Sequence, residues 1–90
     1  MKLDLDIKNY FEHLVADRIA KLNIDESNDV DFQSDLMCLA LNQLPPRYIR
    51  HEVDMAFYLP ANERLQMEMQ AKDAVEKSLG FLRERENEKN

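Results

Sequence analysis

The chain has 90 residues, enough for one domain with a thin hydrophobic core. Apolar residues make up 44% of it and charged residues 33%, a balance typical of a folded protein rather than a disordered tail. The net charge of −6 argues against binding duplex DNA or RNA through a general basic surface, because such binding requires the neutralisation of many phosphates.

The composition also bounds the fold class and the compartment. One glycine and three prolines are too few breaks for several short strands, so we expect an all-α, mainly helical single domain of three to four helices over residues 1–90. The single cysteine, Cys38, excludes an intrachain disulfide and fits a reducing compartment. The amino-terminal residues mix acids with apolar residues and predict neither a signal peptide nor a membrane span. We therefore expect a cytoplasmic protein.

The first helix is predicted from residue 7 onward, because apolar residues recur at spacings of three and four and fall on one helical face. These residues are Ile7, Phe11, Leu14, Val15, Ile19 and Leu22. Asp4 and Asp6 suit the positive end of the helix dipole. A polar connection is predicted at residues 23–28, which prefer turns and caps.

The second helix is predicted to begin near Asp29 or Asp31, either of which can cap it. Every residue from 36 to 41 is apolar, so we expect this helix to be buried on more than one side, with Cys38 as a small core residue. It must end just before the prolines at positions 45–46, because the residue that precedes a proline is pushed out of the helical conformation.

Residues 49–59 are ambiguous, because their apolar positions fit both the alternation of a strand and one face of a short helix. We favour an irregular or short helical piece, since a lone strand has nothing to pair with inside a monomer. A strand paired across a dimer axis is the alternative.

The last helix is predicted for residues 61–86, after Pro60, and residues 84–90 are expected to fray. Its apolar series is Leu65, Met69, Val75, Leu79 and Leu82. Such a helix is roughly 39 Å long at ~1.5 Å per residue, whereas a compact domain of this length is about 31 Å across. The helix therefore overhangs its own domain. Either its end frays, or its apolar stripe packs on a second copy of the chain. The second alternative predicts a homodimer.

The residues give no sign of catalysis. The chain has no Gly-rich phosphate loop, no HExxH motif and no evident Ser, His and Asp set. His13 and Asp17 form an i, i+4 pair that could in principle bind a metal, but a solvated helix face explains the pair better. We expect no enzyme activity, no metal and no cofactor.

The charge distribution points to a ligand site instead. One residue in five is acidic, yet residues 36–51 contain neither Asp nor Glu and include Arg47, Arg50 and His51 near their end. Burial of a helix explains the first half of this window but not the second. Arginine carries a planar fork that suits phosphate, and Tyr48 offers a flat face on which a base can stack. The preceding prolines reduce backbone freedom, so fewer conformations are lost when a ligand binds.

Two interpretations of this segment are open. In the first, Asn42, Arg47, Tyr48 and Arg50 bind a ligand at the end of the second helix. In the second, the prolines only stop the helix, Tyr48 packs on the core, Arg47 pairs with one of many acids, and Asn42 bonds the carbonyls freed at the helix end.

The block over residues 35–58, DLMCLALNQLPPRYIRHEVDMAFY, resembles the late competence protein family known as ComFB. The shared pattern is an Asp, an apolar run, Leu-Asn, a proline pair and a tyrosine. The flanking helices agree in length and kind, so the resemblance covers most of the chain.

The resemblance implies a small, mainly helical homodimer. Some relatives act as receptors for cyclic dinucleotide second messengers, including cyclic di-GMP and cyclic di-AMP, which fits Arg47 as a phosphate ligand and Tyr48 as a stacking face. Some relatives also carry cysteines just before the shared Asp and can bind zinc there. This chain has VDFQS at positions 30–34 and no cysteine in that stretch, so we expect no zinc.

Two functions are therefore carried forward. In the first, a homodimer binds a cyclic dinucleotide and changes its contact with a regulatory protein partner. In the second, the chain is a protein interaction module linked to competence or regulation, in which the segment after the prolines docks an acidic partner without any nucleotide.

Overall fold

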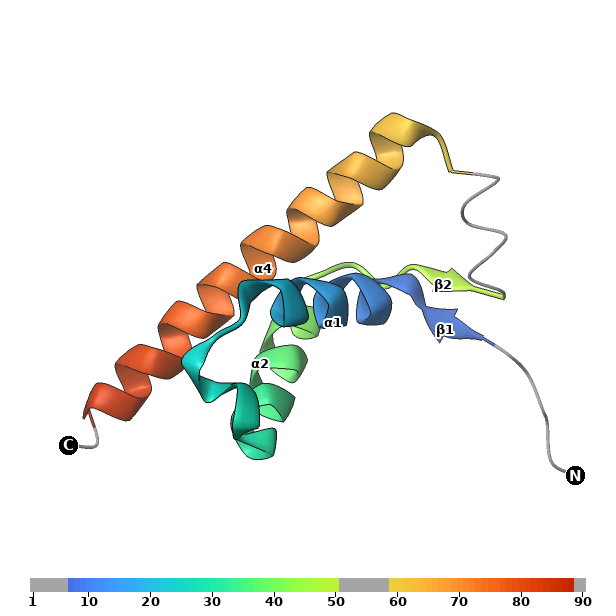
Figure 1. Ribbon diagram of the computed structural model, residues 1–90. Helices are drawn as coiled ribbons and strands as arrows, with labels where there is room; N and C mark the ends of the chain where they lie inside the picture. Colours follow the sequence, from blue (N-terminus) through green and yellow to red (C-terminus); the bar gives the residue numbers. More distant parts are fainter. Residues whose placement is uncertain (1–6, 51–58, 89–90) are drawn as a thin grey trace, which may run out of the picture.

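A computed structural model describes residues 7–50 and 59–88. Three α-helices, one 3₁₀ helix and one pair of two-residue strands make up its regular structure (Figure 1). In chain order these elements are β1 (Lys8–Asn9), α1 (Tyr10–Leu22), η1 (Asp25–Asn28), α2 (Val30–Asn42), β2 (Tyr48–Ile49) and α4 (Ala61–Glu88). The predicted all-α, mainly helical class is confirmed.

Helix α1 begins at Tyr10 because Asn9 caps it. The Asn9 Oδ1 accepts a hydrogen bond from the Phe11 N–H at 3.2 Å, and the Glu12 carboxylate accepts one from the Asn9 N–H at 3.2 Å. This capping box satisfies two backbone donors at the helix start. The predicted start at Ile7 is therefore wrong by three positions, and the Ile7 side chain is 53% exposed. The expected role of Asp4 and Asp6 lies outside the described residues.

The connection between α1 and α2 includes the polar segment predicted at residues 23–28. Helix α1 ends at Leu22, and its C-cap, Asn23, adopts the left-handed conformation, with φ at 49°, which asparagine tolerates better than most residues. Asp29 then caps α2, since its Oδ1 accepts from the Phe32 N–H at 3.0 Å. Of the two predicted capping residues, Asp29 and Asp31, the structure selects Asp29. Helix α2 ends at Asn42 with Gln43 as its C-cap, as the prolines require.

The core lies where α4 crosses α1 and α2, which both lie on one side of it (Figure 1). Leu36 and Ala40 are fully buried there, so the predicted central position of α2 is confirmed for these two residues. The prediction for Cys38 is wrong, because its side chain is exposed. Two positions along a helix correspond to a rotation of about 200°, so Cys38 lies on the side of α2 away from Leu36.

The predicted apolar face of α4 is buried in the carboxyl-terminal half of the helix but not in its amino-terminal half, and Leu79 is partly buried against the core. Val75 and Leu82 are buried as expected, but Leu65 and Met69 are 58% and 57% exposed. The buried face is completed by Met67, Ala71, Ala74 and Ser78. These are mostly small residues, which let the neighbouring helices approach closely but give a weak hydropathy signal. The helix runs to Glu88, two residues beyond its predicted end. Fraying of residues 84–90 concerns motion and stays a prediction.

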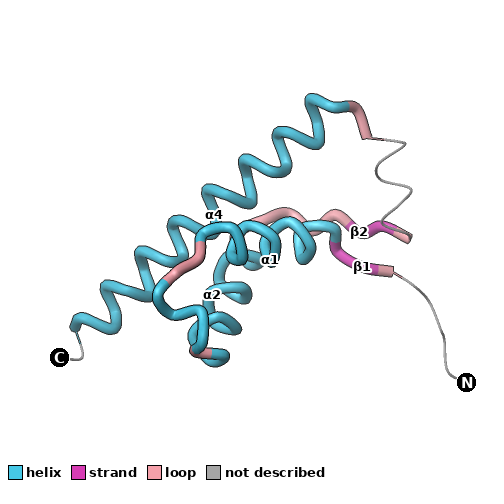
Figure 2. Tube along the Cα trace, viewed as in Figure 1, coloured by secondary structure: helices cyan, strands magenta, loops and turns pink. Residues whose placement is uncertain are grey.

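A short antiparallel pair of strands joins the amino-terminal segment to the residues after the prolines (Figure 2). Lys8 pairs with Ile49, and Asn9 pairs with Tyr48. The preference for an irregular or short helical piece from residue 49 onward is therefore wrong at Ile49, which finds its partner strand within the same chain. Residues 51–58, the rest of that ambiguous segment, lie outside the described part. No helix in the described ranges is both long and apolar enough to span a bilayer.

Candidate functional site

The end of α2 is held by Gln43 rather than by Asn42. The Gln43 side-chain amide donates to the Leu39 carbonyl at 3.2 Å and to the Ser78 hydroxyl at 2.7 Å. One carbonyl in the last turns of α2 is thereby satisfied, and α2 is tied to the buried Ser78 of α4. The capping role considered for Asn42 is filled by its neighbour. Asn42 itself is exposed on the last turn of α2, and its role as a ligand contact stays a prediction.

The backbone of Arg47 is fixed from both sides by the start of α1. Its N–H donates to the Asn9 Oδ1 at 2.9 Å, and its carbonyl accepts from the Tyr10 N–H at 2.7 Å. Asn9 therefore caps α1 and holds Arg47 with the same oxygen. The rigid presentation expected from the prolines is reinforced by long-range hydrogen bonds that join residues nearly forty positions apart in the sequence.

Tyr48 points to solvent. Tyr48 is 68% exposed, whereas the next residue, Ile49, is 8% exposed and anchors the strand to the core. Alternation along a strand places these two side chains on opposite faces of the pair. The interpretation in which Tyr48 packs on the core is therefore wrong, because most of the residue's surface is exposed.

The guanidinium of Arg47 lies 3.4 Å from the carboxylate of Glu63 on α4. This is the ion pair with a chain acid that the competing interpretation expected. Both side chains are about half exposed, at 50% and 42%. Exposed pairs of this kind contribute about 0–1 kcal/mol. A phosphate in the same place could replace Glu63 at little energetic cost.

Arg47 and Glu63 both line a groove between the proline turn and α4, with a volume of about 270 Å³. The lining side chains are Phe11, Pro45, Pro46, Arg47, Glu63, Gln66, Met67 and Gln70. Phe11 and Met67 are buried and form its apolar part, while Gln66 and Gln70 are exposed and offer amide donors and acceptors.

The structure brings only one of the four predicted site residues, Arg47, into this groove. Tyr48 and Arg50 are exposed on the strand segment beside it, and Asn42 is on α2. The sequence reasoning missed Glu63, Gln66 and Gln70. Their spacing of three and four places them on one face of α4, which was the available signal.

The His13 and Asp17 pair has a structural explanation. The Asp17 carboxylate binds Lys21 at 2.9 Å on the exposed face of α1, and this hydrogen bond lowers the pKa of Asp17 below its model-compound value of 3.8. The His13 ring lies beside the Tyr10 ring, with centroids 6.1 Å apart. Within residues 7–50 and 59–88, no three His, Cys, Asp or Glu side chains are grouped closely enough to hold a metal ion.

Comparison with known protein families matches residues 8–86 to the family described as "Late competence development protein ComFB". The matched range includes both strands, η1, α1, α2 and most of α4. Neither a curated protein nor a solved structure matches the chain.

Proposed function

The chain belongs to the ComFB family of late competence development proteins, and we propose that it is a non-enzymatic cytoplasmic receptor that binds cyclic di-GMP or cyclic di-AMP as a homodimer. The observation that supports this most is that Arg47 and Tyr48, neighbours in the sequence, are both exposed to solvent. Asn9 holds the backbone of Arg47 in place.

The chemistry of this segment suits a nucleotide with two phosphates and two purines. The Arg47 guanidinium can bind a phosphate through two parallel hydrogen bonds, and Arg50 adds a second exposed cation. The Tyr48 face can stack on a purine. Because the backbone is already ordered, little conformational entropy is lost on binding. The anion is held locally, as a chain with a net charge of −6 requires.

The homodimer belongs to the same proposal. A cyclic dinucleotide has two equivalent halves, so a two-fold axis between two chains would present one Arg47 and one Tyr48 to each half. Leu65 and Met69 lie one helical turn apart and are exposed on α4, where a second copy could cover them. The same helix also carries Glu63, the ion-pair partner of Arg47, in its first turn.

Isothermal titration with cyclic di-GMP and cyclic di-AMP tests the proposal. We expect Arg47→Ala to weaken binding by about tenfold or more, because a charge-assisted contact to phosphate is lost. The matched control Arg85→Ala removes an exposed arginine at the far end of α4 and should leave the affinity unchanged. Glu63→Gln should strengthen binding, since it removes the carboxylate that competes for Arg47.

The outcomes separate clearly. Titrations of the folded wild-type dimer that release no heat with either nucleotide would overturn the proposal. Equal affinities of the wild type and Arg47→Ala would show that the nucleotide binds elsewhere. Since the Arg47 pair is exposed, Arg47→Ala should lower the free energy of unfolding by about 1 kcal/mol at most, and its melting curve provides the folding control.

The second candidate is the protein interaction module without a nucleotide. The observation that favours it is the contact of Arg47 with a carboxylate, the group that an acidic partner would bring. In that case a pull-down succeeds without added nucleotide. Arg47→Ala would then weaken capture at low salt more than at high salt.

A further inference from the structure

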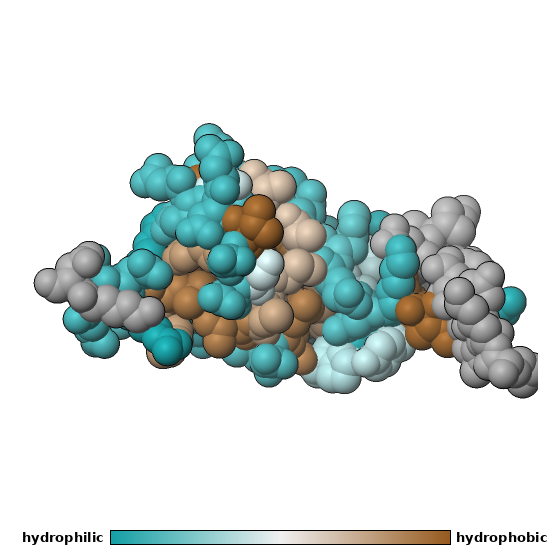
Figure 3. Space-filling view, turned by 90° about the horizontal axis from the view of Figure 1, so that it is seen from below, coloured by the Kyte–Doolittle hydropathy of each residue, from teal (hydrophilic) through white to brown (hydrophobic). Residues whose placement is uncertain are grey.

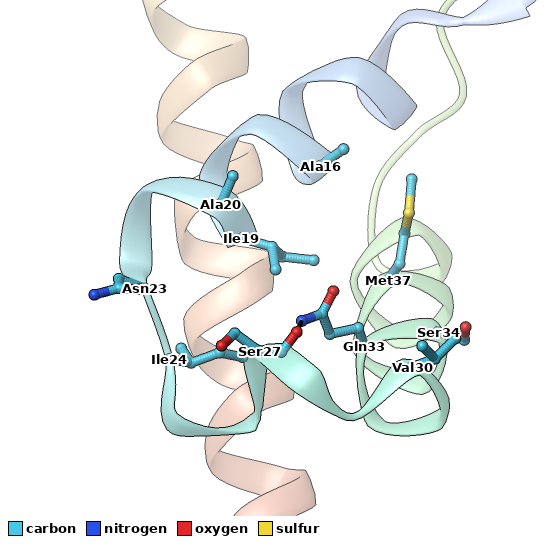
Figure 4. A pocket seen from close by; sticks show the side chains of 10 residues that line it. All are labelled: Ala16, Ile19, Ala20, Asn23, Ile24, Ser27, Val30, Gln33, Ser34 and Met37. Carbon is cyan, nitrogen blue, oxygen red and sulfur yellow. Dashed lines mark hydrogen bonds between the residues drawn. The ribbon is translucent and has the colours of Figure 1, made fainter.

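A second groove lies at the other end of α1, between the carboxyl-terminal half of that helix, η1 and the first turns of α2 (Figure 4). Its volume is about 340 Å³. Six of its ten lining side chains are apolar: Ala16, Ile19, Ala20, Ile24, Val30 and Met37. Asn9 and Arg47, at the opposite end of α1, do not contribute to it.

The groove has a buried apolar floor and an exposed apolar edge. Ile19 and Ile24 are each 8% exposed and belong to the core. Val30, at the first position of α2, is 76% exposed. The Gln33 amide donates to the Ser27 carbonyl within the groove (Figure 4), so that backbone acceptor is already satisfied. Among the described residues, exposed apolar surface is therefore the main feature that this groove offers a partner.

Negative charge borders the apolar surface. Residues 22–46 contain five carboxylates and neither Lys nor Arg. Asp25, Asp29 and Asp31 line a shallow depression that shares Val30 with the groove. The fourth acid of that depression, Glu26, is the one that is paired with a described cation, Arg83, at 3.0 Å. Figure 3 shows the molecule from below, the side on which α2 and η1 lie. Apolar surface, in brown, gathers there beside hydrophilic surface, in teal.

We propose that this groove docks an amphipathic basic helix of a partner protein. Apolar side chains of the partner helix would lie against Ala16, Ala20 and Val30, and its Lys or Arg residues would contact Asp25 and Asp31. Helix-in-groove recognition uses apolar anchors at spacings of three and four, and complementary charges on the rim set the partner choice and the association rate.

The acidic residues beside the groove disfavour a nucleic acid, a membrane surface or a second copy of the chain as its occupant. A nucleic acid or an anionic membrane surface would be repelled by Asp25, Asp29 and Asp31, which form the acidic rim of the groove. A second copy of the chain related by a two-fold axis would place this acidic rim against itself. This inference concerns a site separate from the Arg47 groove and does not depend on nucleotide binding.

The probe for the test is a fluorescent helical peptide of about 14 residues with Leu at spacings of three and four and Lys elsewhere. Fluorescence anisotropy should show binding to the wild-type protein, and a matched peptide with Glu in place of Lys should not bind. Ala20→Arg, which fills the groove with a cation, and Asp31→Lys should each weaken binding by about tenfold. Asp73→Lys changes the charge equally on the exposed face of α4 and should stay within about twofold of the wild type.

A second measurement needs no variant: the amide chemical shifts of the wild-type protein are recorded by NMR with and without the peptide. It still tests the proposal if a variant fails to fold. The peptide should shift signals of the residues that line the groove and leave those of residues 61–70 in place. Absence of binding, or binding that Asp73→Lys weakens as much as Asp31→Lys, would overturn the proposal, because only diffuse attraction to an acidic protein would remain. If Ala20→Arg changed the sedimentation coefficient of the protein alone, the groove would be an interface between copies and the proposal would be wrong.

Discussion

Leu36 and Cys38 lie two positions apart in α2, and the fold gives them opposite environments. Leu36 is fully buried against the other helices, whereas Cys38 is exposed. A run of six apolar residues in one helix therefore has a buried side and a solvent side. In a three-helix domain of this size, each helix keeps one side exposed to solvent, because the other two helices cannot surround it.

Truncation of these two residues should have different effects on the free energy of unfolding. Leu36→Ala should lower it by about 2–5 kcal/mol, because the substitution removes buried methyl groups and leaves a cavity. Cys38→Ala should change it by about 0.5 kcal/mol or less. Urea denaturation followed by circular dichroism measures both values. A thiol reagent should also modify Cys38 in the folded protein without denaturant, and protection of that thiol would contradict its exposure.

At the scale of elements, α4 is tied to the rest of the fold along its length. Glu63 meets Arg47 in its first turn, Ser78 accepts from Gln43 near its middle, and Arg83 binds Glu26 of η1 near its end. The Arg83 contact is bidentate, with its Nε and Nη2 each donating to a Glu26 oxygen at 3.0 Å. Bidentate geometry is the arrangement in which an exposed ion pair contributes most reliably.

The Arg83 contact predicts a pH dependence. Its hydrogen bonds lower the pKa of Glu26 below the model-compound value of 4.5. A carboxylate with a lowered folded-state pKa contributes stability that is present above pH 4.5 and lost as the pH falls through the folded-state pKa. The melting temperature of Glu26→Gln should therefore lie below that of the wild type at neutral pH, with a difference in stability of about 0.5–1 kcal/mol.

Thermal melts of the wild type and Glu26→Gln across the acid range measure this effect. The two melting temperatures should converge well below pH 4.5, where the wild-type carboxylate is protonated. Glu84→Gln, which removes an exposed carboxylate next to Arg83, is the matched control and should leave the melting temperature near that of the wild type. A constant gap between wild type and Glu26→Gln at every pH would mean that packing, not charge, joins η1 to α4.

The whole molecule is elongated because α4 is longer than the domain that it covers. Its 28 residues span about 42 Å at 1.5 Å per residue. The radius of gyration is 14.9 Å, larger than the ~12 Å of a compact domain of this length. Leu65 and Met69 remain exposed on this helix. This shape is the basis for proposing that a second chain packs on α4.

Sedimentation at micromolar concentration should therefore show a dimer. Replacing both Leu65 and Met69 with Ser should shift the protein towards the monomer, because the apolar contact area between the copies would be lost. Val30→Ser removes an even more exposed apolar side chain from the second groove and should leave the dimer intact. A wild-type monomer with an ordered α4 would refute the inference from the overhang.

Local signals in the sequence determined several features of this protein. Three features follow from capping chemistry, proline geometry and periodicity, which act over a few neighbouring residues. They are a cap at Asp29 or Asp31, the end of α2 before the prolines and the existence of three helices. The same proline geometry left two poses of Tyr48 open, and the structure decides for the exposed one. The ComFB resemblance was carried by a local pattern as well, and the match over residues 8–86 confirms it.

Only the tertiary structure decided the features that depend on distant partners. The strand pair of Lys8–Asn9 with Tyr48–Ile49, the hold of Asn9 on Arg47 and the place of Glu63 opposite Arg47 join segments with no local signal for one another. The buried face of α4 was likewise settled by close packing of small residues, which hydropathy ranks below Leu65 and Met69. The physical reason is the same in each case: periodicity reports how a segment folds locally, whereas contacts between segments are selected by the shape and hydrogen bonding of the assembled chain.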